Sequence, residues 1–170
     1  RFHILLAQDC LKYGKNLITP SYISPELQAM DSAVKDKGLL FLNEMGLDPG
    51  IDHLSAMHII DRLRKEGARI KSFKSWCGGL VAPENDDNPW HYKFSWNPYN
   101  VVHAGQDGGL CLENGKLRYL PYSRIFSEIE SISMREEAFD AYLNRNSLRY
   151  IPIYGLEEAE TFVRGTLRSP

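Results

Sequence analysis

The segment GLDPGIDH, residues 46–53, places two aspartates and a histidine around a Pro-Gly turn, directly after an apolar run. Carboxylate and imidazole groups can hold or move protons, so a turn that collects them is a candidate for acid–base chemistry. Asp48 precedes the turn and is the candidate catalytic group, although starting the turn or capping the next helix is the competing interpretation. Asp52 and His53 open a predicted helix, where capping and structural roles are the expected ones.

A tyrosine and a cysteine are further candidates, and each also has a purely structural interpretation. The hydroxyl of Tyr22, after a predicted strand, could serve a site or be satisfied within the core. Cys77 lies in the segment WCGG, and a lone cysteine is most often a small buried apolar side chain. The three cysteines lie far apart and outside any CxxC spacing, and the five histidines show no metal-ligand motif. The sequence therefore predicts neither a disulfide framework nor a metal site.

The elements before the Pro-Gly turn alternate between helix and strand. Residues 2–13 are predicted to form a helix and residues 16–21 a short buried strand. A second helix is expected over residues 25–37, capped by Ser24, and a second strand over residues 39–43. This α-β-α-β order with short connections predicts a parallel sheet of the doubly wound, Rossmann type.

Ligands of such sheets collect at the carboxyl ends of the strands. Here those ends are the segments 20–22 and 43–48, which contain Tyr22 and Asp48. The polar turn thus falls where this architecture usually places its ligand.

The pattern changes after Asp52, and we expect a second, α+β domain with a mixed or antiparallel sheet. The predicted elements are an amphipathic helix over 53–66, strands over 68–76, 92–96 and 110–120, and a charged helix over 123–143. Asn114-Gly115 is a tight hairpin signal within the third of these strands. We place the domain boundary near residue 47, with partial domains over residues 1–47 and 48–170.

The composition excludes several function classes. Of the 170 residues 43% are hydrophobic, and the formal net charge of -2 comes with no basic stripe for nucleic acid and no polybasic patch for a membrane surface. No apolar run approaches the roughly 20 residues that span a bilayer, and the first residues lack a signal-peptide pattern. We therefore expect a cytoplasmic protein with no nucleic-acid or membrane partner.

A glycine-rich GxGxxG loop is not found before residue 15, where a nucleotide-binding domain would carry it. The glycines of residues 105–109 have the wrong spacing, and a predicted strand follows them. We expect that the first half of the nucleotide-binding domain lies outside this chain, and that the isolated chain is inactive.

Six segments in order along the chain resemble the glutamate-forming saccharopine dehydrogenase family. They are SYISPEL (21–27), NEMGLDPGIDH (43–53), SWCGGLVAPENDDNP (75–89), YKFSW (92–96), NRNSL (144–148) and EAETFVRGTLR (158–168). The resemblance implies a Rossmann domain for NADP, with NAD as the alternative, and an inserted substrate domain. It also implies an oxidoreductase of lysine metabolism that interconverts saccharopine with L-glutamate and 2-aminoadipate 6-semialdehyde.

The resemblance also implies roles for individual residues. It implies catalytic roles for Asp48, Tyr22 and Cys77. It implies that saccharopine is bound by Ser21, Tyr22, Asp48, Arg145, Thr166, Leu167 and Arg168. It implies that the cofactor lies near Ser21, Leu47 and Asn97. Arg164 matches no substrate position and is expected to support the fold or the surface.

Two positions depart from the family pattern, and two other functions compete. Leu143 and Asn146 replace a turn proline and an acidic side chain beside Arg145. A related carboxynorspermidine-type reductive-amination enzyme shares the architecture, and a catalytically silent binding or assembly module is the alternative of another class. A homodimer is compatible with the resemblance, but the sequence alone fixes no oligomeric state.

Overall fold

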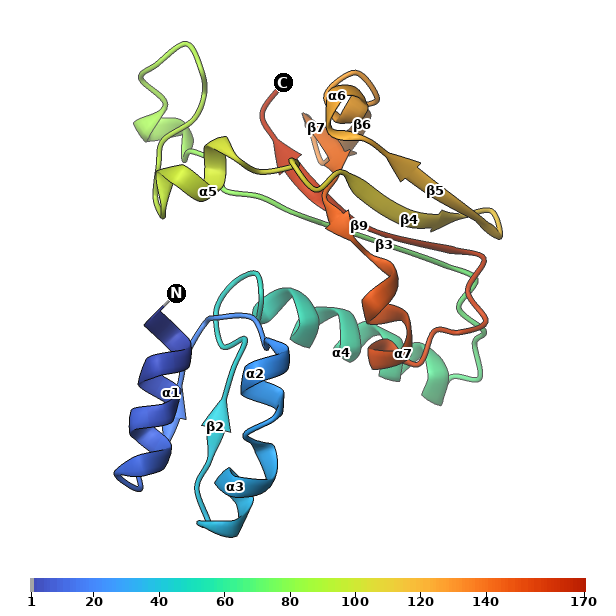
Figure 1. Cartoon of the computed structure of the whole chain (residues 1–170). Helices are drawn as coiled ribbons and strands as arrows, with labels where there is room; N and C mark the ends of the chain where they lie inside the picture. The colour runs from blue at the N-terminus through green and yellow to red at the C-terminus, as the bar shows by residue number, and fades with distance from the viewer. Residues whose placement is uncertain (1) are drawn as a thin grey trace. The chain divides into compact units, whose positions relative to one another are not determined.

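The computed structural model describes residues 2–170, which divide into two compact units, residues up to Ile59 and residues from Ile60 (Figure 1). Helix α4, Ile51–Lys65, contains the point of division.

The first unit has the predicted alternation of helix and strand. Its elements before α4 are α1 (Phe2–Lys12), β1 (Leu17–Ile18), α2 (Pro25–Gln28), α3 (Asp31–Asp36) and β2 (Phe41–Leu42). Strands β1 and β2 pair in parallel, with Leu17 opposite Phe41. The side-chain oxygen of Ser24 accepts a hydrogen bond from the Leu27 amide at 3.3 Å, which confirms the predicted cap.

The prediction of one continuous helix over residues 25–37 is wrong. The amide of Met30 bonds to the carbonyl of Leu27, a tighter bond than the i to i-4 bond of an α-helix, and the chain divides there into α2 and α3. Leu27 and Val34 are nevertheless both buried, so the apolar pattern that predicted one helix is shared by two.

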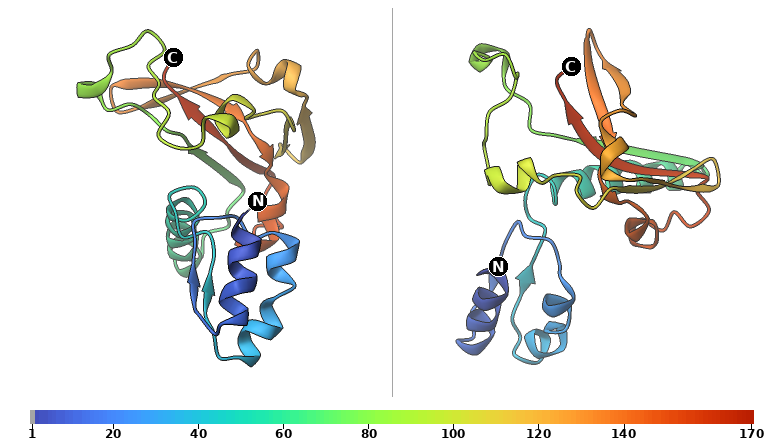
Figure 2. Two further views of the ribbon diagram at one scale, coloured as in Figure 1. Left: turned by 60° about the vertical axis from the view of Figure 1, so that its left-hand side comes forward. Right: turned by 45° about the horizontal axis from the view of Figure 1, so that its top comes forward.

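The second unit is built on a sheet of seven strands with the order β5-β4-β9-β7-β6, in which β3 also pairs with β9 and β8 with β4 (Figures 1 and 2). The strands are β3 (Ser72–Cys77), β4 (Gly109–Glu113), β5 (Lys116–Leu120), β6 (Glu130–Met134), β7 (Glu137–Leu143), β8 (Arg145–Asn146) and β9 (Thr161–Arg168). The short helices are η1 (Pro83–Asn85), α5 (Pro98–Val102), α6 (Tyr122–Ile125), η2 (Leu148–Tyr150) and α7 (Ile151–Tyr154). The pairs β3-β9 and β4-β8 are parallel and the others antiparallel, so the sheet is mixed and mostly antiparallel, which agrees with the predicted mixed or antiparallel sheet.

The tight hairpin predicted at Asn114-Gly115 is confirmed. The two residues join β4 to β5 and both have positive φ, 50° and 75°. A two-residue turn of this kind matches the twist of the flanking strands, and asparagine followed by glycine tolerates it best.

The charged helix predicted over residues 123–143 is wrong. Only α6 at its start is helical. After the irregular residues 126–129 comes the β6–β7 hairpin, which turns at Arg135 with φ 55°. Ile132 faces Phe139 across the hairpin, and the end of β7 pairs with β9, where Ala141 is fully buried. Pairing with a distant strand outweighs the helix preference of the charged residues.

The strand predicted over residues 92–96 is also wrong. The segment lies in irregular structure between Pro89 and Pro98 and has no partner strand among residues 2–170. The ring of Tyr92 instead meets Phe94 edge to face at 5.6 Å between centroids, and Phe94 is 55% exposed. An alternating pattern alone does not form a strand where no ladder is available.

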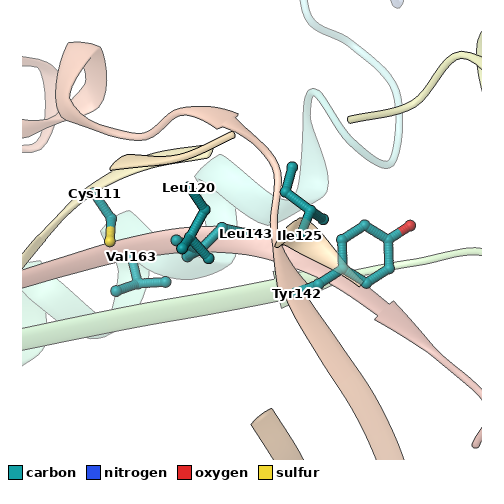
Figure 3. Close-up of a cluster of buried hydrophobic side chains, with 6 residues drawn as sticks. All are labelled: Cys111, Leu120, Ile125, Tyr142, Leu143 and Val163. Atoms are coloured by element: carbon teal, nitrogen blue, oxygen red, sulfur yellow. The ribbon is translucent and has the colours of Figure 1, made fainter. Parts of the chain in front are cut away.

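The core of the second unit is formed by side chains of β4, β5, α6, β7 and β9. Figure 3 shows its buried cluster: Cys111, Leu120, Ile125, Tyr142, Leu143 and Val163. Burial raises the pKa of the Cys111 thiol. The aromatic rings of Phe73, Tyr154 and Phe162 form a second packed group, with Phe73 stacked on Phe162 at 4.8 Å. All three cysteines are free thiols.

Candidate functional site

The Pro-Gly turn of the first unit is a closed loop that depends on two glycines. The Gly46 amide donates to the Pro49 carbonyl at 2.9 Å, and the Ile51 amide donates to the Gly46 carbonyl at 3.0 Å. Gly50 has φ 151°, and a Cβ there would lie 2.1 Å from the Gly46 oxygen. The loop can close this tightly only because both positions lack side chains, and it presents Asp48 between them.

Tyr22 and Asp48 are brought together in the first unit. The Tyr22 hydroxyl donates a hydrogen bond of 2.9 Å to Asp48 Oδ1 across 26 positions of sequence. Tyr22 follows β1 and Asp48 follows β2, so the contact arises because the carboxyl ends of two parallel strands share an edge. A hydroxyl paired with a carboxylate can hold or pass a proton at this edge.

Ser21 and Leu47 lie beside this pair along the chain. The Ser21 side-chain oxygen accepts from the Thr19 hydroxyl at 3.1 Å, and the Ser21 amide donates to the same hydroxyl oxygen, which fixes the start of the turn. Leu47 is 62% exposed. The two predicted cofactor neighbours are thus the chain neighbours of the two residues that meet at this edge.

The capping role of Asp52 is confirmed. Asp52 Oδ1 accepts a hydrogen bond of 2.7 Å from the Gly50 amide at the start of α4. His53 Nε2 lies 3.4 Å from Glu44 Oε2, and both side chains are mostly buried. Glu44 could not be identified from the sequence, because a glutamate after a strand gives no sign of a contact with a helical residue nine positions later.

The second unit brings Cys77 and Arg168 to one end of the sheet. Cys77, the last residue of β3, lies opposite Thr166 of β9. The next residue is Gly78, where a Cβ would lie 1.8 Å from the Leu167 carbonyl oxygen. The WCGG segment thus needs its first glycine for the close approach of two strand ends.

Arg168 is held by a carbonyl and an aromatic ring. Its Nη1 donates to the Leu167 carbonyl at 2.9 Å, and its guanidinium carbon lies 5.2 Å from the centre of the Tyr92 ring. These two contacts fix the plane of a group that suits carboxylates bidentately. Arg164, in contrast, lies 4.1 Å above the ring of buried Tyr150, which places it in the fold, as expected.

Arg145 begins β8 with a left-handed backbone. It has φ 60°, its side chain is exposed, and its amide donates to the Gly108 carbonyl at 2.9 Å. Asn146 Oδ1 accepts from the Leu148 amide at 2.9 Å, the bond that an aspartate would also make. The first of the two departures, Leu143, is a core side chain that is 6% exposed.

The remaining predicted residues differ in exposure. Thr166 and Leu167 are buried, and the Thr166 hydroxyl accepts from Asn144 Nδ2 at 3.0 Å. Asn97 is exposed and caps α5 through a 3.0 Å bond from the Tyr99 amide. Thr166 and Leu167 thus lie in the paired part of β9, between β3 and β7.

Residues 2–170 were also compared with the requirements of a metal site and of a membrane-spanning helix. Among residues 2–170 no group of three or more histidine, cysteine, aspartate or glutamate side chains is placed to hold a metal ion. No helix in the same part of the chain combines the length and the apolar character needed to cross a membrane.

Comparison with known proteins shows extensive similarity to enzymes of one family. The chain is 40% identical to the Pyricularia oryzae saccharopine dehydrogenase [NADP(+), L-glutamate-forming] over 168 residues, 98% of this chain and 37% of that protein. It is 41% identical to the mitochondrial alpha-aminoadipic semialdehyde synthase of Bos taurus over 170 residues, 98% of this chain and 18% of that protein. The chain thus spans less than two fifths of the length of these relatives.

The fold matches as well. A solved structure of apo histidine-tagged saccharopine dehydrogenase (L-Glu forming) from Saccharomyces cerevisiae superposes with a TM-score of 0.89 at 38% identity, over 99% of this chain and 38% of that chain. Residues 46–170 match the model of the saccharopine dehydrogenase C-terminal domain. The chain belongs to the saccharopine dehydrogenase family.

Proposed function

We propose that this chain is part of an NADP-dependent oxidoreductase that interconverts saccharopine with L-glutamate and 2-aminoadipate 6-semialdehyde in lysine metabolism. The observation that carries the proposal is the 2.9 Å hydrogen bond from Tyr22 to Asp48 at the shared edge of two parallel strands. It occurs in a chain about 40% identical to enzymes whose names specify NADP(+) and L-glutamate formation.

The reaction requires proton handling at a secondary amine. NADP, when bound, supplies the chemistry of hydride transfer. Asp48 would accept a hydrogen bond from the amine of saccharopine, and Tyr22, bonded to Asp48, would hold the carboxylate in position. Ser21 and exposed Leu47, on the same strand ends, would contact the cofactor. As the resemblance implies, we assign Asn97 to the surroundings of the cofactor and Cys77 to a catalytic role.

The substrate presents three carboxylates, and the second unit carries two arginines suited to them. Arg168 is oriented by the Leu167 carbonyl and Tyr92, and Arg145 is the exposed first residue of β8, with a left-handed backbone. Planar guanidinium groups bind carboxylates through two parallel hydrogen bonds. We assign both to saccharopine binding, with Thr166 and Leu167 beside Arg168 on β9.

The domain assignment is part of the proposal. We assign residues 1–47 to a Rossmann domain for NADP, with NAD as the alternative, and residues 48–170 to the substrate domain. A small-molecule substrate, the absence of nucleic-acid and membrane partners, a homodimer and a cytoplasmic location remain predictions. The name of the Bos taurus relative, in contrast, places that protein in mitochondria.

A spectroscopic assay tests the function. The full-length protein is mixed with NADP and saccharopine, and NADPH formation and L-glutamate are measured. We expect both to form in equal amounts, and carboxynorspermidine in place of saccharopine to give little NADPH. Turnover of carboxynorspermidine but not saccharopine would favour the related reductive-amination enzyme, and turnover of neither would favour a silent binding module.

A further inference from the structure

Glu44, two positions beyond the end of β2, holds the turn that carries Tyr22. Its amide donates to the Ser21 carbonyl at 3.0 Å, and its Oε1 accepts from the Ile23 amide at 3.1 Å. The two hydrogen bonds hold Ser21 and Ile23, the residues on either side of Tyr22. Glu44 thereby limits the positions that the Tyr22 backbone can take.

The second carboxylate oxygen of Glu44 reaches helix α4. Glu44 Oε2 lies 3.4 Å from His53 Nε2, and the two side chains are only 19% and 16% exposed. On its other side, His53 Nδ1 lies 3.8 Å from Asp52 Oδ2, and Asp52 Oδ1 caps Gly50. A chain of polar contacts therefore runs from the Tyr22 turn to the loop that presents Asp48.

The backbone of Glu44 is also unusual. Its φ is 59°, in the left-handed region that glycine and asparagine adopt most readily. A glutamate here carries conformational strain that either of those residues would reduce. Only a side chain as long as that of glutamate makes both contacts, with the Ile23 amide and with His53.

We propose that Glu44 is a positioning residue for the reaction assigned above. Its carboxylate holds the 21–23 turn against α4, so that the Tyr22 hydroxyl meets Asp48. Glu44 acts through Tyr22. The inference rests on the proposed function, because it assigns Tyr22 and Asp48 to the reacting end of the substrate.

Two substitutions in the full-length protein separate this role from backbone strain. Glu44→Asn suits the left-handed backbone but shortens the side chain by one methylene, so it cannot reach both partners, and we expect kcat/KM for saccharopine to fall about tenfold or more. Glu44→Gln has the same length, with an oxygen for the Ile23 amide and an NH2 group that can donate to His53 Nε2, so it keeps both contacts and should stay within about threefold of the wild type. Asp31→Asn, whose exposed carboxylate pairs with Lys35, is the matched control and should change nothing.

A double-mutant cycle tests whether Glu44 acts through Tyr22. If it does, Tyr22→Phe should lower kcat/KM much less in the Glu44→Asn background than in the wild type. Additive effects, or wild-type kcat/KM in Glu44→Asn, would overturn the proposal, as would equal losses in Glu44→Asn and Glu44→Gln. A wild-type protein without saccharopine turnover would refute the proposed function instead, so the two failures are distinguishable.

Discussion

Arg168→Lys tests the assignment of the substrate carboxylates most sharply among single substitutions. Lysine keeps the charge, but it loses the planar fork that the Leu167 carbonyl and Tyr92 orient. A hydrogen bond to a charged group is worth about 1.5–3 kcal/mol, and about 1.4 kcal/mol corresponds to a factor of ten. We therefore expect the KM for saccharopine of the full-length enzyme to rise about tenfold or more, with a much smaller change for NADP.

Arg164→Lys, four positions earlier on β9, is the matched control. Its guanidinium lies over buried Tyr150, and such a contact contributes up to about 2 kcal/mol when desolvated. We expect a lower melting temperature with an unchanged KM for saccharopine. In steady-state NADPH formation, a raised KM in Arg164→Lys with an unchanged KM in Arg168→Lys would refute the assignment of Arg168 to saccharopine.

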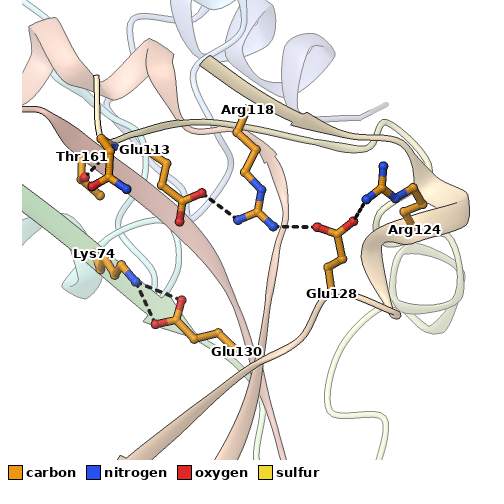
Figure 4. Close-up of polar contacts among 8 residues, drawn as sticks. Lys74, Glu113, Arg118, Arg124, Glu128, Glu130 and Thr161 are labelled. Atoms are coloured by element: carbon orange, nitrogen blue, oxygen red, sulfur yellow. Dashed lines mark hydrogen bonds and ion pairs between the residues drawn. The ribbon is translucent and has the colours of Figure 1, made fainter. Parts of the chain in front are cut away.

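Three further outcomes follow from the geometry. Asp48→Asn should lower kcat by on the order of 10²-fold with little change in melting temperature, whereas unchanged kcat and a lowered melting temperature would support a purely structural role. Gly78→Ala should lower the melting temperature, because its Cβ would lie 1.8 Å from the Leu167 oxygen, and a stable variant would contradict that packing. The hydrogen bond from Arg118 lowers the pKa of Glu128 (Figure 4), so its stabilisation is present above the ordinary value of 4.5 and lost as pH falls through the folded pKa. Acid titration of unfolding should therefore be less steep in Glu128→Gln, and an identical slope would contradict the lowered pKa.

Local features of the fold could be predicted from the sequence. The Ser24 cap and the Asn114-Gly115 hairpin depend on residues that are neighbours along the chain, so the pattern specifies them. The helix predicted over residues 123–143 failed because β7 is stabilised by β9, a strand that begins at Thr161. Single-sequence periodicity carries no information on such a distant partner.

The candidate site could be predicted in part. The meeting of Tyr22 and Asp48 follows from a general rule on the carboxyl ends of parallel strands. The roles of Arg145 and Arg168 came from the resemblance, since no spacing rule relates two arginines on different strands. Glu44 could not be found, because its importance depends on a left-handed backbone and on the position of His53.

The salt bridges of the second unit show why the pattern of charged residues predicted a helix where the structure has a strand. Lys74 of β3 binds both carboxylate oxygens of Glu130 in β6, at 2.8 and 3.0 Å, across 56 positions of sequence (Figure 4). In the sequence, Glu130 reads as part of a charged helix. In the structure its carboxylate meets a lysine from another strand, and exposed pairs of this kind contribute little stability.

Isotope transfer tests the central claim most directly. The nitrogen of saccharopine joins the α-carbon of its glutamate part to the terminal carbon of its lysine part, and only oxidation at the latter yields L-glutamate and the semialdehyde. Saccharopine carrying deuterium at that terminal carbon, incubated with NADP and the full-length enzyme, should give deuterated NADPH, as measured by mass spectrometry. Saccharopine deuterated at the glutamate α-carbon should give unlabelled NADPH and L-glutamate that retains the label. Transfer of deuterium from the glutamate α-carbon to the cofactor would contradict the account.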